Sequence, residues 1–590
     1  MASEAAPPDG PQDARVDRRA FLHRMGALTA AAAAGVHWPP EPLSAGGPLP
    51  SSPAGVPVPD PPLSPGRAAA AEAFWADARR AASAGGALAR PPGELTAWEA
   101  GVRIRDGSLR AADLVAACLE RIRKLDAVYL AFNTVTEAEA LATAAALDDA
   151  LDRDRRESLP GGKAPGLLHG IPLALKDNVY TAGIRTTANA HMFRDFLPPF
   201  DATLLTRLRG AGSVLVGKTQ MGPLATTRAL TPDGEITTLN AWAPGDPRIS
   251  PGGSSSGSAT GVAARMVTTS VGTQTGGSIT VPAASQGLTG LKPTMGRVSL
   301  RGVIPLTYTR DHPGPIARDA RDAALMLQVM AGPDPADPRT LGLPPVPDYL
   351  TAAIPVPGSG QGDGAGEAMI RWPTRLGVPP EWAGAGGPQG ERRRRFLASM
   401  EEGGVEVVEV PPPPGWAELS SGIFNAGRLP ERSEPFLPWL REDVRLFGVT
   451  LSSWIQGLLL SGDEYVKAQR GRLALLRLAL DHVFQQCDAV VQANHVPFDM
   501  IGLPLVTFPI GFREAGEGGG GFDGPLPEGV LVGAPPFGEE RLLSLAALWQ
   551  ARSDHHLRRP PDPAAPDSGR TRAPGGRGRL GLEQVADLSQ

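Results

Sequence analysis

The chain of 590 residues is long enough for about four domains of roughly 150 residues each, although single enzyme domains can be longer. Hydrophobic residues make up 42% of it and charged residues 20%, which is typical of a globular protein and excludes a fibrous or fully disordered one. The formal net charge of −5 gives no basic footprint for nucleic acid, and two cysteines, Cys118 and Cys487, are too few for a disulfide scaffold or a thiolate-rich metal site.

Residues 1–37 have the features of an export signal. Residues 15–36 read RVDRRAFLHRMGALTAAAAAGV, in which a basic patch precedes about a dozen small and apolar residues, too few for a membrane span. The arginine pair resembles the twin-arginine export motif, although Asp17 and His23 stand where that motif usually has Ser or Thr and Lys. An amphipathic N-terminal helix is the alternative. We therefore expect a protein that meets a bacterial export machinery, is periplasmic or extracellular, and has no permanent membrane span.

Composition divides the rest of the chain into three parts. Residues 38–67 form a linker, because eleven prolines fall within 38–66 and favour an extended chain. Residues 558–590 are rich in Pro, Gly and Arg and have too little apolar content to join a core, so we expect a disordered tail. The folded body is therefore predicted over residues 68–557.

Helical and strand patterns alternate along this body. Apolar residues recur at helical spacing over 108–125, and the alanine-rich stretch 134–153 is also predicted to be a helix. The short apolar run 171–175 suits a buried strand, residues 201–209 suit a helix, and 214–216 suit a second strand. Alternation of this kind predicts an α/β protein with a buried sheet.

Two motifs in the body match well-known patterns but lack the structural context that those patterns need. Residues 212–219 match the phosphate-loop pattern, yet a helix precedes them and their middle residues favour a core strand, so nucleotide binding is not expected. Residues 253–257 match the G-x-S-x-G elbow of α/β-hydrolases, which requires a strand directly before it. The proline-rich stretch 244–251 cannot be a central strand, so we do not interpret this motif as an elbow.

A longer pattern carries more information. Residues 250–294 read SPGGSSSGSATGVAARMVTTSVGTQTGGSITVPAASQGLTGLKPT and resemble the signature of the amidase signature family. Upstream, GIPLALKDN at 170–178 resembles the strand that bears the catalytic lysine of that family. The resemblance continues through 503–512 and 529–546, so it covers nearly all of the body in order. It implies an α/β amidase-signature fold, in which helices cover both faces of a central mixed β-sheet.

The resemblance also implies a Ser-Ser-Lys catalytic triad. By motif position Ser278 is the nucleophile, Ser254 the bridging serine and Lys176 the base. Chemistry supports these types, because a serine hydroxyl needs a base to become nucleophilic, and a lysine is a base only when burial keeps it neutral. The expected oxyanion hole consists of the backbone amides of a four-residue turn: Thr275, Gly276, Gly277 and Ser278. Ser255, Gly252 and Gly253 are expected to support the site.

Two positions depart from the family pattern. The family usually has Asp where Gln274 stands and Arg where Thr280 stands. The loss of both partners of a buried ion pair is milder than the loss of one, because no uncompensated charge remains. We therefore expect that a neutral contact replaced the pair.

The sequence thus predicts an exported enzyme that hydrolyses a linear carboxylic amide through a Ser278 acyl-enzyme, with no cofactor, no metal and no nucleic-acid partner. Two alternatives are a protein like the glutamine amidotransferase subunit of the same family, which an export signal disfavours, and a catalytically weakened or dead binding protein on the same fold. The substrate stays open beyond a small-molecule amide. Aromatic residues in the predicted acyl-pocket segment, if they are not plain core, favour an aromatic or apolar acyl group: Trp416, Phe424, Phe436, Trp439 and Trp454.

Overall fold

An eleven-stranded mixed sheet organises the structure, a computed structural model that describes residues 65–86, 89–157, 165–358, 367–514, 517, 522 and 524–563. The strand order is β1-β3-β2-β4-β6-β5-β12-β13-β11-β9-β10. The strands are β1 (Phe132–Val135), β2 (Pro172–Lys176), β3 (Val214–Thr219), β4 (Thr269–Gln274), β5 (Thr289–Lys292), β6 (His312–Ala317), β9 (Thr374–Val378), β10 (Val405–Glu409), β11 (Ala489–Val491), β12 (Leu505–Arg513) and β13 (Leu526–Gly533). A separate hairpin pairs β7 (Val356–Pro357) with β8 (Ala368–Met369).

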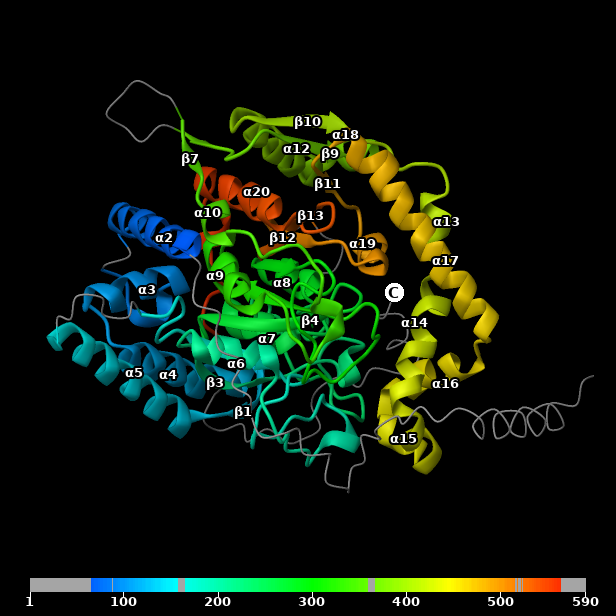
Figure 1. Cartoon of the computed structure of the whole chain (residues 1–590), viewed down its shortest axis with the longest axis horizontal. Coiled ribbons are helices and arrows are strands. Elements are labelled where there is room, and N and C mark those ends of the chain that lie inside the picture. The colour runs from blue at the N-terminus through cyan, green and yellow to red at the C-terminus, as the bar shows by residue number, and fades with distance from the viewer. Residues whose placement is uncertain are drawn as a thin grey trace, which may run out of the picture. The chain divides into compact units, whose positions relative to one another are not determined.

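Helices flank this sheet, as the sequence predicted (Figure 1). Those of the first half are α2 (Pro65–Ala84), α3 (Ala97–Asp106), α4 (Ala111–Tyr129), α5 (Glu137–Glu157), α6 (Thr203–Gly210), α7 (Ser256–Ala263), α8 (Thr280–Gln286), α9 (Ala320–Met330) and α10 (Tyr349–Ala352). Those of the second half are α11 (Pro380–Ala383), α12 (Gly387–Glu402), α13 (Trp416–Ser421), α14 (Phe424–Ser433), α15 (Leu437–Glu442), α16 (Leu451–Leu459), α17 (Gly462–Leu478), α18 (Phe484–Gln486), α19 (Val496–Ile501) and α20 (Glu539–Arg552).

The predicted elements are present with shifted ends. The helix predicted over 108–125 is α4, whose apolar stripe of Leu114, Cys118 and Ile122 is buried. The helix predicted from 134 begins later, at Glu137, because the preceding residues form β1.

The parallel strands β2, β3 and β4 decide where a site can form. Leu175 of β2 lies opposite Lys218 of β3 and opposite Val271 of β4, so the carboxyl ends of all three strands meet at one edge of the sheet. Ligands of α/β proteins bind at such edges, because the connecting loops bring side chains together there. Lys176 ends β2 at this edge, and the turn that carries Ser278 follows β4.

The domain boundaries differ from the prediction at both ends of the body. Helix α2 starts at Pro65, three residues inside the predicted linker. Arg559 and Asp562, which the sequence placed in the tail, form ion pairs with Glu94 and Arg121 of the body. The chain divides into two units, Met1–Val56 and Pro57–Gln590, and every described residue belongs to the second. The predicted export signal, linker residues 38–64 and tail residues 564–590 lie outside the described residues.

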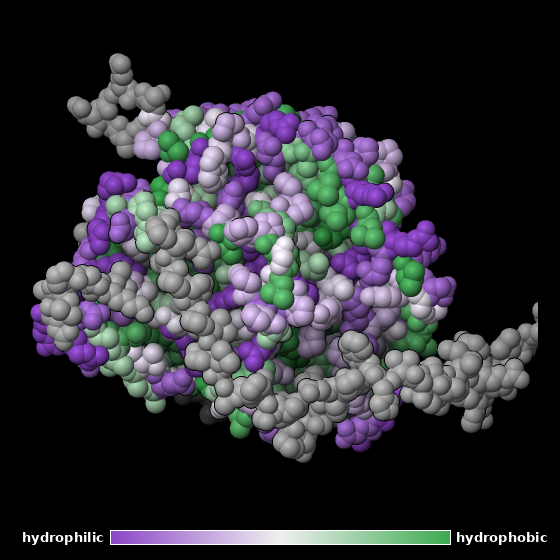
Figure 2. Space-filling view, viewed as in Figure 1, coloured by the Kyte–Doolittle hydropathy of each residue, from purple (hydrophilic) through white to green (hydrophobic). Residues whose placement is uncertain are grey.

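The surface is largely hydrophilic on the face shown in Figure 2, and hydrophobic residues gather over α17. On that helix Val466 is 57% exposed and Leu473 is 65% exposed. Within the described ranges, no single helix has the length and apolar composition of a membrane span, and one pair of helices bent by 96°, Val444–Leu459 with Gly462–Gln486, passes that test together.

Candidate active site

Lys176 is fully buried at the end of β2, where every residue of the strand is buried. Burial lowers the pKa of its amine from 10.5 to about 7, and the charge of Asp311 opposes this shift only in part. A large fraction of the amine is therefore neutral near pH 7, which is the form that a base needs.

The Lys176 amine contacts Ser254, as the predicted triad requires. The distance from Nζ to Ser254 Oγ is 2.7 Å, and Nζ also donates to the side-chain and backbone oxygens of Thr273, at 2.9 and 3.1 Å. Asn178 donates to the same Thr273 hydroxyl at 3.1 Å. Thr273 and Asn178, which sequence reasoning did not single out, therefore hold the amine against Ser254.

The glycines before Ser254 let its loop pass between packed segments. A Cβ on Gly253 would lie 2.5 Å from the backbone oxygen of Thr227, and one on Gly252, whose φ is +75°, would lie 2.5 Å from Pro282 Cα. Ser255 is also fully buried, and its hydroxyl accepts from the Thr273 amide at 3.3 Å. All three residues lie beside Ser254, and their supporting role stays a prediction.

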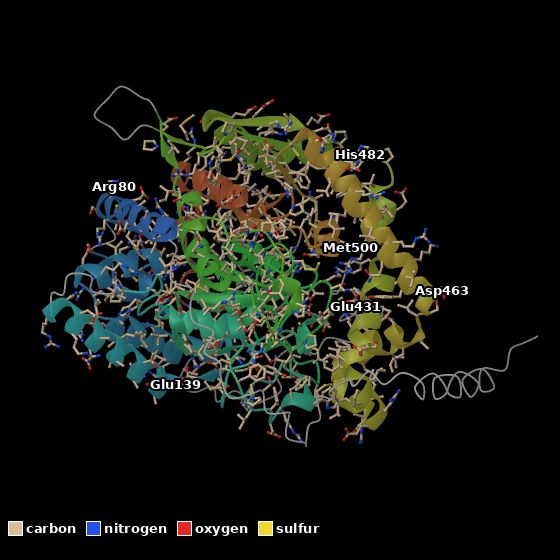
Figure 3. All side chains as sticks on the ribbon, in the orientation of Figure 1. Arg80, Glu139, Glu431, Asp463, His482 and Met500 are labelled. Carbon is tan, nitrogen blue, oxygen red and sulfur yellow. The ribbon has the colours of Figure 1, made fainter. Side chains whose placement is uncertain are left out.

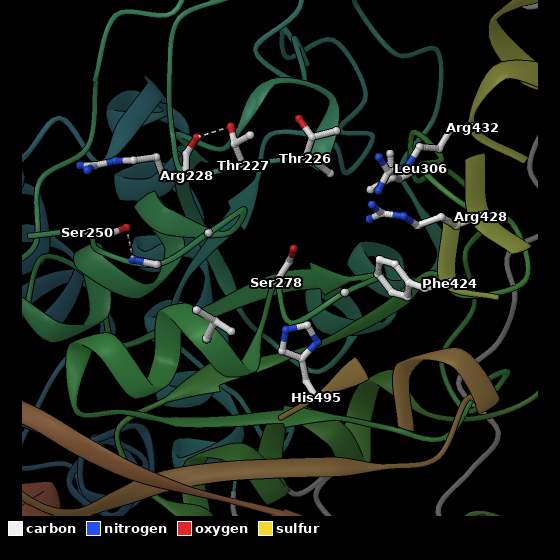
Figure 4. A pocket seen from close by; sticks show the side chains of 15 residues that line it. Thr226, Thr227, Arg228, Ser250, Ser278, Leu306, Phe424, Arg428, Arg432 and His495 are labelled. Carbon is white, nitrogen blue, oxygen red and sulfur yellow. Dashed lines mark hydrogen bonds between the residues drawn. The ribbon is translucent and has the colours of Figure 1, made fainter. Parts of the chain in front are cut away.

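Ser278 follows β4 on a tight turn and lines a pocket. Figure 4 shows its side chain pointing into the pocket between Thr226 on one side and His495 on the other. Gly252 and Gly253 line the same pocket, so the loops of both serines meet there. Among the described contacts, however, no hydrogen bond joins Ser254 to Ser278.

The predicted oxyanion hole needs one correction. The Gly277 amide donates to Asp499 Oδ2 at 2.8 Å, so it is not available to a substrate oxygen. The amides of Thr275, Gly276 and Ser278 have no acceptor among the described residues, and Gly276 and Ser278 line the pocket. These three amides stay candidates; removal of one such donor typically costs roughly 3 kcal/mol of transition-state stabilisation.

A neutral contact does stand where the family usually has an ion pair. Gln274 Oε1 accepts from the Thr280 amide at 2.9 Å and from the Thr280 hydroxyl at 3.2 Å. The Ile279 amide donates to the same oxygen at 2.8 Å. The Gln274 side chain therefore holds the two residues that follow Ser278.

The charge in this network belongs to Asp499, which sequence reasoning missed. Its carboxylate accepts from Gln274 Nε2 at 2.8 Å and from His495 Nδ1 at 2.8 Å, and lies 3.7 Å from Lys292 Nζ. Burial alone would raise the pKa of Asp499, but His495, Lys292 and Gln274 together lower it to about 2. A buried, ionised carboxylate thus anchors the nucleophile turn.

Gln274→Asp is expected to lower the free energy of unfolding by about 2–4 kcal/mol, because it replaces a donor to Asp499 with a second carboxylate. Two facing carboxylates repel each other, which raises the pKa of one of them in the folded chain. As the pH falls from 8 to about 5, that carboxylate takes up a proton, so the loss of unfolding free energy should become smaller. Urea unfolding at the two pH values measures it, with the exposed Gln389→Asp as control. An unchanged unfolding midpoint and unchanged activity would contradict this account.

The phosphate-loop match has a structural explanation. Residues 214–219 of the phosphate-loop match form the buried strand β3, as predicted. Its lysine, Lys218, is fully buried, lies 3.4 Å from Asp177 and donates to Thr186 Oγ1 at 2.7 Å. This lysine is therefore part of the core.

The pocket wall differs from the aromatic one that the sequence favoured. Of the five aromatic residues, only Phe424 lines the pocket, while Phe436 packs with Trp439 and Trp454 in an aromatic cluster. Arg428 and Arg432 line the wall beside Phe424. Sequence reasoning missed both arginines, because a spacing of four places two residues on one helix face but does not tell a buried face from an exposed one.

With this geometry in place, comparisons with known proteins identify the family. The family model described as "Amidase" matches residues 113–427. A Glutamyl-tRNA(Gln) amidotransferase subunit of Moorella thermoacetica is 32% identical over 520 residues, which cover 79% of this chain and 98% of that protein. The chain therefore belongs to the amidase family.

Solved structures agree with this assignment. A peptide amidase in complex with the competitive inhibitor chymostatin is 28% identical, with a TM-score of 0.65 over 80% of this chain and all of that chain (100%). An inhibitor-bound chain, from work on a vestigial protein complex and the origins of an s-triazine catabolic enzyme, is 27% identical. Its TM-score is 0.64, over 78% of this chain and 98% of that one.

Proposed function

We propose that this protein cleaves the C–N bond of a linear carboxylic amide through an acyl-enzyme on Ser278. The observation that carries the proposal is the 2.7 Å contact between Ser254 Oγ and a fully buried Lys176 amine whose pKa is lowered to about 7. A buried lysine without a carboxylate partner is a costly feature for a fold to keep, and a basic amine beside a serine is what serine activation needs.

In the acylation step, neutral Lys176 takes a proton from Ser254 while Ser254 takes one from Ser278. The Ser278 oxygen attacks the amide carbonyl, and the negative charge that develops on the carbonyl oxygen meets the free amides of the turn after β4. The C–N bond then breaks, Ser254 gives its proton to the leaving nitrogen, and Lys176 returns a proton to Ser254.

In the deacylation step, water occupies the place of the leaving nitrogen. Ser254 and Lys176 take its proton as its oxygen attacks the acyl carbon, and the proton passes to Ser278 as the ester bond breaks. The products are a carboxylate and ammonia or an amine.

A second candidate is an ammonia-donating component of an amidotransferase, and the relatives favour it. Several curated relatives are named as subunits of a Glutamyl-tRNA(Gln) amidotransferase and match over nearly their whole length. Their names concern a transfer-RNA substrate, which an exported chain would not meet. The export segment that we propose at residues 1–37 therefore favours the amidase over the amidotransferase component.

A fluorophosphonate that labels activated serines tests whether the site is catalytic. We expect one adduct, located on Ser278 by mass spectrometry, and hydrolysis by the full chain of at least one of an aryl amide, a peptide amide, a fatty amide, an anionic amide and L-glutamine. Glutamine as the sole substrate would favour the amidotransferase. No adduct and no turnover would favour a binding protein on this fold instead.

A further inference from the structure

Arg428 and Arg432 line one wall of the Ser278 pocket, with Arg310 buried behind them; Arg228 also lines the pocket but donates to the backbone oxygens of Pro247 and Thr238. Arg428 and Arg432 lie one turn apart on α14 and line the pocket, where they are 8% and 4% exposed. Arg310 is 1% exposed and donates to the backbone oxygen of Thr275 at 3.1 Å, so it reaches the nucleophile turn. Figure 4 shows the Arg428 and Arg432 side chains on the same side of the pocket as Phe424.

Arg428 and Arg432 lack an ion-pair partner in the described part of the chain. The Arg428 side chain has one hydrogen bond, from Nε to the neutral Asn425 Oδ1 at 2.9 Å. The Arg432 Nε atom is buried and has no hydrogen-bond partner. Buried charges are ordinarily paired, because the loss of hydration is not otherwise compensated.

Three acids, Asp311, Glu431 and Asp499, act on this cluster through their charges, and all have other partners, those of Asp499 being the Gln274, His495 and Lys292 contacts described above. Asp311 accepts from the backbone amides of Leu306 and Thr307, at 2.8 and 3.1 Å, and from Thr275 Oγ1. Glu431, labelled in Figure 3, accepts from Thr309 N at 2.9 Å and from Tyr465 OH at 2.8 Å.

Arg428 and Arg432 therefore have no direct ion-pair partner among the described residues, and the charge of Asp311 opposes the effect of burial on Arg432 only in part. Burial, and then the charges of Arg432 and Arg310, lower the pKa of Arg428 from 12.5 to about 7. A bound anion would relieve this repulsion and give the free guanidinium N–H groups acceptors.

Phe424 sets how near that anion would be to the reaction. The Arg428 guanidinium stacks on its ring, 4.1 Å from the centroid, and a Cβ on Gly276 would be 4.0 Å from the edge of the same ring. The Arg428 guanidinium and the nucleophile turn therefore lie about one aromatic ring apart. A short acyl chain is long enough to join a carboxylate at the guanidinium to an amide carbonyl at Ser278.

No Asp or Glu is among the described residues that line this pocket. A substrate ammonium group would have no carboxylate to pair with and would face the arginines, so an α-amino acid fits the charges poorly. We propose, on the basis of the proposed amide hydrolysis, that Arg428 and Arg432 form a subsite for a substrate carboxylate, and that the substrate is an anionic amide without an amino group: the monoamide of a short dicarboxylic acid.

Charge-matched substrates test this proposal. The full chain would be given malonamate, succinamate, glutaramate and adipamate, each beside the neutral amide of equal length, with L-glutamine as the zwitterionic match to glutaramate. We expect kcat/KM for the best anionic amide to exceed that of its neutral match by about 100-fold, and glutaramate to exceed glutamine.

Arg428→Met and Arg432→Met should each lower kcat/KM for the anionic amide by about 30–100-fold and change the neutral amide less than threefold. Arg445→Met, an exposed arginine paired with Asp443, is the matched control and should change neither. Equal losses on anionic and neutral amides would mean that the arginines serve the fold, and preference for glutamine would also overturn the proposal.

A binding measurement separates this inference from the proposed catalysis. Calorimetry of the Ser278→Ala variant with malonate, succinate, glutarate and adipate should detect one site, weakened at least 10-fold by Arg432→Met and by raising the salt from 50 to 500 mM. Binding without any turnover by the unmutated chain would remove the proposed catalysis and keep the anion subsite. Absence of dicarboxylate binding, together with turnover of neutral amides, would remove the subsite and keep the catalysis.

Discussion

Lys176→Met is expected to lower kcat by roughly 10⁴-fold or more, to about the level of Ser278→Ala, because the two residues act as one unit. Methionine keeps the length and much of the volume of the lysine side chain but cannot take a proton from Ser254. Steady-state kinetics of the two single variants and the double variant measure the effect. A double variant much slower than either single one would show that the two residues act independently.

The unmutated chain should show a matching pH dependence. Because burial lowers the pKa of Lys176 to about 7, kcat/KM should rise with pH and level off above about 7. The pKa of Lys176 in the folded chain lies below the ordinary value of 10.5. The contribution of this lysine to stability is therefore fully present above pH 10.5 and is lost as the pH falls from 10.5 toward 7. As the pH falls from 10.5 to 7, Lys176→Met should therefore become more stable relative to the unmutated chain. A large drop in its melting temperature would instead give the lysine a structural role.

The sequence indicates the proposed catalytic side chains more clearly than it indicates their surroundings. Lys176, Ser254 and Ser278 lie in contiguous motifs, so their types and order are legible along the chain. Strand β2 is recognisable in the sequence because a short run of apolar residues is typical of a buried strand. Those local signals place the lysine and the two serine loops at one sheet edge.

The rest of the site comes from contacts across long stretches of the chain, which local patterns do not encode. Asp499 contacts Gln274 from 225 residues away. The departures at Gln274 and Thr280 indicated the loss of a charge pair, yet a carboxylate on α19 supplies charge to the same turn. Arg428 and Arg432 read as ordinary surface charges on a helix, and only the folded pocket shows that they are buried without acid partners.

Asp499→Ala is expected to lower the free energy of unfolding by about 3–5 kcal/mol, since it leaves the buried Lys292 amine without its carboxylate. Burial already lowers the pKa of Lys292 to about 8 while Asp499 opposes the shift. The same change removes the acceptor of the Gly277 amide, so the nucleophile turn should loosen and kcat should fall by at least 10-fold. Urea unfolding and steady-state kinetics measure the two effects.

Asp499→Asn and the double variant Asp499→Ala with Lys292→Met separate charge from shape. Asparagine keeps one acceptor oxygen, so it should lose less stability than alanine. The double variant should recover part of the loss, because it leaves no unpaired buried charge.

The folded pKa of Asp499, about 2, lies below the ordinary value of 3.8. Its contribution is therefore constant above about pH 5 and is lost only as the pH falls toward 2. Equal stability of the unmutated chain and Asp499→Ala at pH 7 would show that the turn around Ser278 does not depend on this carboxylate.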